Sequence, residues 1–101
     1  MYLEISKHTI WINSNGTQKD NEKVTMFHRL LVEHGLNDGS CLETNKNGKG
    51  IALTVCDYST VEELRQYTQD VKALIKAEKL TPTEQDTQIA RECEYQINLE
   101  Y

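Results

Sequence analysis

The composition of the chain argues against several common classes of protein, among them flexible linkers, disulfide-rich proteins and membrane proteins. Its 101 residues include one proline and five glycines, which argues against a flexible linker. Its three cysteines (Cys41, Cys56 and Cys93) are odd in number, widely spaced and form no Cys-x-x-Cys motif, so free thiols in a reducing compartment are the simplest interpretation. No segment approaches the ~18 apolar residues that span a membrane. The first residues also lack the basic and apolar regions of a signal peptide.

These properties predict a cytoplasmic chain without membrane contact. The length favours a single α+β domain over residues 1–101. A core of that size needs neither a metal nor disulfides to be stable.

Positive charge is scarce as well. Sixteen acidic and eleven basic residues give a formal net charge of −5 at pH 7. A groove for a phosphate backbone needs clustered lysine and arginine, so we do not expect direct nucleic-acid binding. Mild acidity is enough to explain solubility. The alternative is a surface that attracts a basic partner.

Motifs for catalysis or cofactor binding are missing too. His28 and His34 are six residues apart on one predicted helix, which is not the spacing of a metal-binding pair. The glycine-containing segment 45–50 leads into a strand, whereas a phosphate-binding loop opens into a helix. No two carboxylates are held in facing positions by their spacing. We therefore expect no catalytic residues, no metal and no cofactor, and interpret the chain as a non-enzyme.

The segment from Cys41 to Cys56 gives the firmest structural prediction. Asn47-Gly48 is typical of a two-residue hairpin turn, because both positions there need positive φ. With this pair at the tip, Thr44 lies opposite Ile51 and Leu42 opposite Leu53. A shift of one residue would expose the apolar face, so burial fixes this register.

The flanking segments predict one strand and two helices. Residues 2–12 favour a strand, interrupted near Lys7-His8, with Trp11 in the core. Residues 22–34 favour a helix capped by Asp20 or Asn21 and ended by Gly35. Residues from 59 or 60 to about 79 favour a second helix that begins with a capping box and ends before Pro82.

The last ten residues decide the fold class. Cys93, Tyr95, Ile97, Leu99 and Tyr101 alternate with polar residues, which predicts a half-buried strand. The competing interpretation is a helix with Ile89, Cys93 and Ile97 at i, i+4 and i+8. With a strand here the order is βαββαβ. That order is typical of a ferredoxin-like α+β fold, a four-stranded antiparallel sheet with two helices on one face.

Because that fold carries many functions, the function has to come from the surface. The C-terminal third is acidic and contains aromatic residues. We predict a small inhibitor of the phage or mobile-element type (anti-defence or immunity) that blocks a basic, nucleic-acid-binding protein by covering its surface. Its partner-binding residues would be Glu84, Asp86, Glu92, Glu94, Gln96, Asn98, Glu100 and Tyr101. The alternatives are a regulatory or structural module that forms a homodimer through its terminal strand, and a small ferredoxin-like enzyme or ligand-binding domain.

Overall fold

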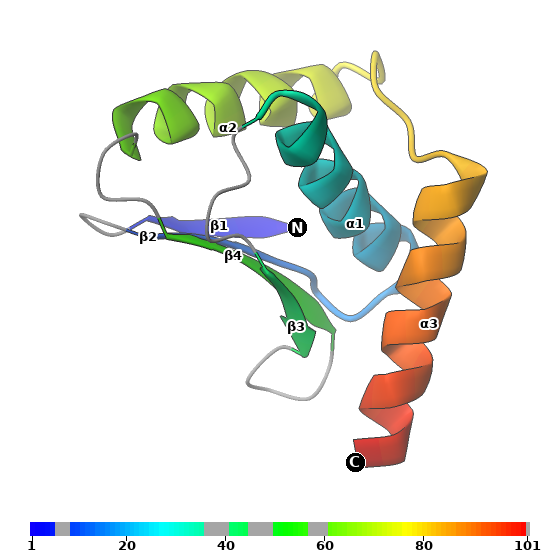
Figure 1. Cartoon of the computed structure of the whole chain (residues 1–101). Helices are drawn as coiled ribbons and strands as arrows, with labels where there is room; N and C mark the ends of the chain where they lie inside the picture. The colour runs from blue at the N-terminus through cyan, green and yellow to red at the C-terminus, as the bar shows by residue number, and fades with distance from the viewer. Residues whose placement is uncertain (6–8, 36–40, 45–49, 57–60, 101) are drawn as a thin grey trace.

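The computed structural model describes residues 1–5, 9–35, 41–44, 50–56 and 61–100. For Leu3, Ile5, Cys41, Glu43, Thr44, Cys56, Val61 and residues 96–100 it describes the backbone only. The elements in chain order are β1 (Tyr2–Ile5), β2 (Thr9–Asn13), α1 (Gln18–Glu33), β3 (Cys41–Thr44), β4 (Ile51–Cys56), α2 (Val61–Lys76) and α3 (Glu84–Glu100) (Figure 1).

The strands form one antiparallel sheet in the order β1-β2-β4-β3. Within the β3–β4 pair, Leu42 lies opposite Leu53 and Thr44 opposite Ile51, so the predicted hairpin register is confirmed. The predicted turn at Asn47-Gly48 lies outside the described residues.

The predicted first strand is two strands. β1 and β2 pair with each other, with Leu3 opposite Ile12 and Ile5 opposite Ile10. Ile10 and Ile12 are buried, because their face of the sheet is covered by helices (Figure 1). Trp11 has the opposite orientation and is only partly buried, so the expectation that it belongs to the core is wrong.

Helix α1 begins earlier than predicted. Its N-cap is Thr17, whose side chain accepts a hydrogen bond of 3.2 Å from the backbone N–H of Asp20. Asp20 and Asn21, the predicted caps, lie buried inside the first turns. The Asp20 carboxylate instead accepts the backbone N–H of Asn15 at 2.8 Å and pairs with the amino group of Met1. Gly35, with a φ of 69°, follows the helix as expected for a left-handed C′ residue.

The core lies between the sheet and the helices. It joins side chains of β2 and β4 with apolar stripes of α1 and α2, and Cys93 of α3 packs against it. The buried apolar residues are Ile10, Ile12, Val24, Met26, Phe27, Leu31, Ile51, Leu53, Val55, Leu64, Val71, Ile75 and Ala90.

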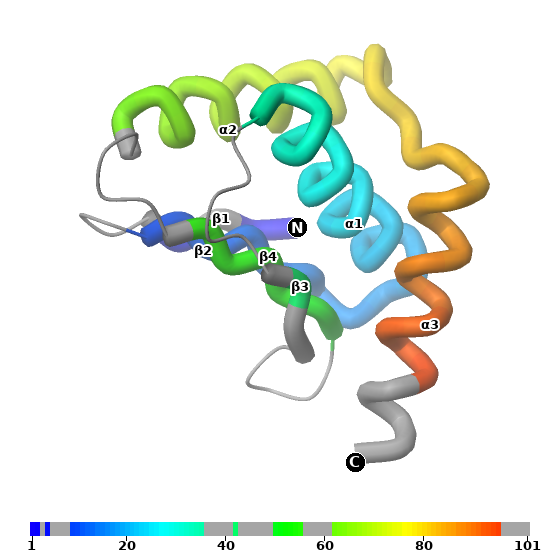
Figure 2. The backbone as a smooth tube through the Cα atoms, in the orientation of Figure 1, coloured from blue at the N-terminus to red at the C-terminus, as the bar shows by residue number. Residues whose placement is uncertain are grey.

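The ferredoxin-like prediction is wrong, because the chain ends in a helix. Residues 84–100 form α3, so no strand of the sheet comes from the C-terminal segment. α3 lies alongside α1 at one side of the sheet (Figure 2). Its buried positions are Asp86, Ala90 and the half-buried Cys93, which recur at three- and four-residue spacing. The competing interpretation, a helix with Ile89, Cys93 and Ile97 on one side, is correct in secondary structure and in placing Cys93 inward, but Ile89 is exposed and the side chain of Ile97 lies outside the described part.

Candidate protein-binding surface on α3

An ion pair between the partly exposed Arg29 and a fully buried carboxylate fixes α3 on the body of the protein. Arg29 Nε of α1 donates to both carboxylate oxygens of Asp86, at 3.0 and 3.2 Å, and Asp86 is 0% exposed. The same carboxylate accepts the backbone N–H of Thr83 at 2.8 Å, and Thr83 Oγ1 accepts the backbone N–H of Asp86 at 3.2 Å. These reciprocal bonds form a capping box that starts the helix. Asp86, predicted to bind a partner, therefore lies inside the fold and holds two helices together.

The charge environment of Arg29 agrees with this anchoring role. The hydrogen bond to Asp86 raises the pKa of the Arg29 guanidinium above its ordinary value, and the bond to Glu33 adds to this. The Arg29–Glu33 bond spans one turn of α1, at 2.9 Å, and is exposed. Arg29 thus remains charged and joins a buried carboxylate to the surface.

Anchoring one side of α3 leaves its opposite side exposed. Five exposed side chains lie on it, which we call the α3 outer row: Glu84, Gln88, Arg91, Glu92 and Tyr95. At about 100° per residue these positions fall within about 100° of the helix circumference. Tyr95 is 62% exposed, the highest value among the large hydrophobic side chains that the structure describes as exposed.

The polar side chains of the outer row form no hydrogen bond or ion pair with the described residues. Other helices of the same chain behave differently. On α1, Gln18 donates to Glu22 one turn away at 3.2 Å, and on α2, Gln66 donates to Asp70 at 3.0 Å. Gln88 and Glu92 have the same residue types and spacing as Gln18 and Glu22, yet no bond joins them. Their polar atoms are therefore available to another molecule.

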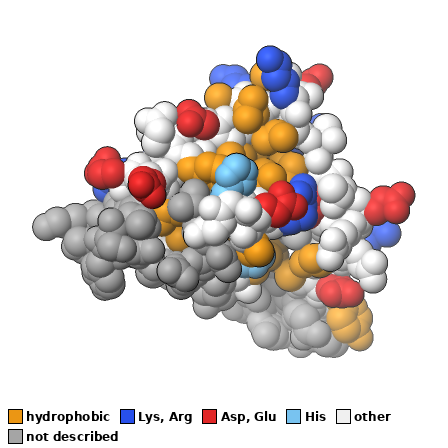
Figure 3. Space-filling view, turned by 45° about the horizontal axis from the view of Figure 1, so that its top comes forward, with side chains coloured by type: hydrophobic (Ala, Val, Ile, Leu, Met, Phe, Trp, Pro, Cys, Tyr) orange, Lys and Arg blue, Asp and Glu red, His pale blue; other side chains and the backbone are white. Residues whose placement is uncertain are grey.

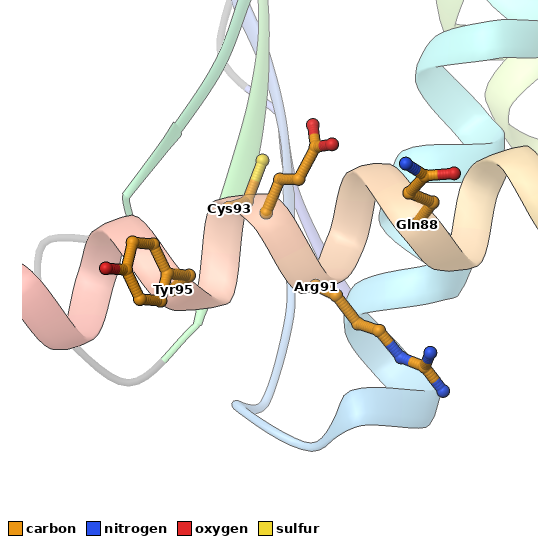
Figure 4. Close-up of a pocket in the computed structure, with 5 residues that line it drawn as sticks. Gln88, Arg91, Cys93 and Tyr95 are labelled. Carbon is orange, nitrogen blue, oxygen red and sulfur yellow. The ribbon is translucent and has the colours of Figure 1, made fainter.

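The outer row borders two adjoining hollows. One, of about 540 Å³, is lined by Gln88, Arg91, Glu92, Cys93 and Tyr95. The other, of about 420 Å³, is lined by Glu84, Thr87, Gln88 and Arg91. The close-up shows Arg91 reaching to the opposite side of the α3 ribbon from Cys93, whose sulfur is directed toward the strands (Figure 4). Arg91 and Gln88 are shared by both hollows.

Negative charge is concentrated on α3. This helix has five carboxylates and one arginine, a formal net charge of −4. Because Asp86 is buried and paired with Arg29, the other side chains of α3 carry a formal charge of −3. With the top of Figure 1 turned forward, acidic and basic side chains are interspersed around hydrophobic ones (Figure 3). A partner attracted by negative charge would therefore meet α3 first.

The helix rearranges the predicted acidic row. Glu84 and Glu92 are exposed on the outer row. Glu94 is partly buried, because two residues along a helix are about 160° apart around the axis, whereas a strand would place them on one face. The backbones of Gln96, Asn98 and Glu100 belong to α3, but their side chains and the whole of Tyr101 lie outside the described part.

Gln88 and Arg91 were missed by the sequence analysis. The signal that places them with Glu84 and Tyr95 is the spacing i, i+4, i+7 and i+11, which becomes visible once α3 is read as a helix.

Cys93 does not make this surface a reactive site. Burial, and to a lesser extent the charge of Glu92, raises the pKa of its thiol above the ordinary value. The thiol therefore stays protonated near neutral pH and is a poor nucleophile. In the part of the chain that is described, no group of histidine, cysteine and carboxylate side chains is arranged to hold a metal ion.

Comparisons of the chain with protein-family models, curated proteins and solved structures found no match. None of the helices in the described ranges combines the length and apolar character needed to cross a lipid bilayer.

Proposed function

We propose that this protein is a small cytoplasmic inhibitor, of the phage or mobile-element type, that uses the α3 outer row to cover a basic, nucleic-acid-binding surface of another protein. The observation that supports it is the outer row itself: exposed side chains that form no bond with the described residues, on a helix whose charge apart from the buried Asp86 is −3. A solvated surface helix would expose charges as well. What distinguishes α3 is the combination of unpaired polar atoms, adjoining hollows and an exposed tyrosine.

The anchoring of α3 favours binding. A helix already held by the Arg29–Asp86 pair loses little conformational entropy when a partner docks, so more of the interaction free energy appears as affinity. The negative charge would accelerate encounters with a basic surface, within a Debye length of about 10 Å at 0.1 M salt. Tyrosine and arginine are enriched among residues that dominate binding energy, which fits Tyr95 and Arg91.

Self-association through the C-terminal segment is less favourable. The edge strand that was to pair between two copies is replaced by α3. Two copies meeting through α3 would bring together formal charges of −3, with the buried Asp86 left out.

The test compares two double variants that remove the same charge from different parts of the chain, α3 in one case and α2 with the turn after it in the other. Glu84→Gln with Glu92→Gln neutralises the outer row, and Glu63→Gln with Glu78→Gln, both exposed, serves as the control. Immobilised wild-type protein should capture a basic protein from host lysate at about 50 mM salt and release it at about 500 mM. The outer-row variant should capture at least about fivefold less, and the control should behave as wild type.

The captured protein is then purified and titrated on its own nucleic acid. Added wild-type protein should displace that nucleic acid in proportion to its concentration. Equal capture by both double variants, or a captured protein that still binds nucleic acid at saturating inhibitor, would contradict the proposal.

A further inference from the structure

Arg91 has no evident role within the fold. The chain has three arginines. Arg29 is paired with Asp86 and Glu33, and Arg65 with Glu62. Arg91 is exposed, and no hydrogen bond or ion pair joins it to the described residues, although Glu94 is only three positions away.

Among the described residues of the outer row, Arg91 is the only cation. An exposed cation is unfavourable for a surface that only attracts positive charge. Removing it would make α3 more negative and would strengthen diffuse attraction to a basic partner. Arg91 nevertheless lines both hollows, with Tyr95 one turn further along the helix. Buried in an interface, an unpaired arginine would be destabilising unless the partner supplied a carboxylate. A partner that places a carboxylate opposite Arg91 would therefore bind better than one that presents only basic residues there.

We propose, on the basis of the function proposed above, that Arg91 binds a carboxylate of the partner, and that this carboxylate lies among lysines and arginines that meet Glu84 and Glu92. Arginine binds carboxylates through two parallel N–H···O bonds, a geometry that lysine cannot reproduce. The outer row thus recognises a basic segment that carries one acidic residue and disfavours a uniformly basic one. This is specificity through a repulsive element within an attractive surface.

The probes are synthetic lysine-rich helical peptides. The parent contains glutamine at its non-lysine polar positions, and each member of the series has one of these changed to glutamate. Affinities are measured by fluorescence anisotropy at about 50 mM salt. At least one glutamate peptide should bind the wild-type protein about tenfold more tightly than the parent, because hydrogen bonds between charged groups are strong when the geometry fits.

Three variants separate the carboxylate contact from net charge. Arg91→Gln and Arg65→Gln remove the same charge, so both should bind the all-basic parent at least as well as wild type does. Only Arg91→Gln should abolish the preference for the glutamate peptide. Arg91→Lys should reduce that preference, expressed as the logarithm of the ratio of the two Kd values, to less than half of the wild-type value. Urea unfolding checks that all three fold.

The results distinguish this inference from the proposed function. If no glutamate position improves binding, or if the preference survives Arg91→Gln, the carboxylate contact is refuted. Salt-sensitive binding of the parent that is lost in the Glu84/Glu92 variant would still support acidic docking in that case. If the parent does not bind but a glutamate peptide binds through Arg91, the carboxylate contact stands and acidic docking fails.

Discussion

At the residue scale, Asp86 performs two structural tasks with one carboxylate. It completes the capping box of α3 and receives the Arg29 guanidinium of α1, while 0% exposed. A fully buried carboxylate is stable only when its oxygens are paired and hydrogen-bonded. Losing the charge would therefore affect both the start of α3 and its attachment to α1.

We predict that Asp86→Asn lowers the free energy of unfolding by about 3 kcal/mol, because Arg29 loses its buried counter-ion and the cap is weakened. Glu33→Gln is the control, since Glu33 is the exposed partner of the same arginine and its loss should change stability by less than about 0.5 kcal/mol. Urea denaturation measures both. Equal effects would show that Asp86 does not anchor the helix.

His28 makes the free energy of unfolding depend on pH. Burial lowers its pKa from the ordinary 6.5, and among the described residues its Nδ1 finds no hydrogen-bond partner. The native state thus disfavours the protonated imidazole, whereas the unfolded state accepts the proton freely. The unfolded state binds more protons as the pH falls below about 6.5, so this term destabilises the protein until the pH passes the native pKa, where it levels off.

We predict that His28→Gln reduces the loss of stability between about pH 8 and pH 5. Urea unfolding of the wild type and the variant at both pH values isolates the effect, because the carboxylates contribute equally to the two proteins. If wild type and His28→Gln lost the same free energy of unfolding between about pH 8 and pH 5, His28 would not be the cause of that loss.

At the element scale, α3 shows that alternating apolar and polar residues do not by themselves distinguish a strand from a helix. Cys93, Tyr95, Ile97 and Leu99 satisfy a strand period, and Ile89, Cys93 and Ile97 satisfy a helical one. The capping box at Thr83–Asp86 and the Arg29 contact select the helix. The Thr83-x-x-Asp86 spacing is visible in the sequence, but its counter-ion on α1 becomes apparent only in the folded chain.

Whether residues 84–100 form a helix or a strand can be tested at Cys93 and Tyr95, two positions that a strand would place on one face. Cys93 is half-buried against the core, and Tyr95 is exposed. We predict that Cys93→Asp lowers the free energy of unfolding by about 2 kcal/mol, since a carboxylate would be partly desolvated. Tyr95→Asp should change it by less than about 0.5 kcal/mol. Similar losses at both positions in urea titrations would favour the strand.

At the scale of the whole molecule, a close backbone approach joins the β3–β4 hairpin to the loop before α1. The backbone N–H of Ser14 donates to the carbonyl of Ile51 at 2.9 Å. A Cβ at Gly50 would lie 3.0 Å from both the backbone nitrogen of Gly16 and Oγ of Ser14. Only glycine allows this approach without displacement of the backbone.

We predict that Gly50→Ala lowers the free energy of unfolding by about 2 kcal/mol and accelerates amide hydrogen exchange at Ser14. Gly35→Ala is the comparison: its Cβ would meet nothing within 4 Å, but its φ of 69° is unfavourable for alanine. That variant should lose about 1 kcal/mol and leave exchange at Ser14 unchanged. Unaltered exchange in Gly50→Ala would mean that the loop tolerates the extra atom.

The sequence by itself determined the features whose cause is local. The β3–β4 register follows from turn chemistry and alternation, the end of α1 at Gly35 from a left-handed cap, and the surplus of negative charge from composition. The tertiary structure alone decided whether residues 84–100 form a helix or a strand, which of their carboxylates is buried, and which side chains form the outer row. These depend on Arg29, 57 positions away from Asp86 in the sequence, and no local pattern specifies a contact at that distance.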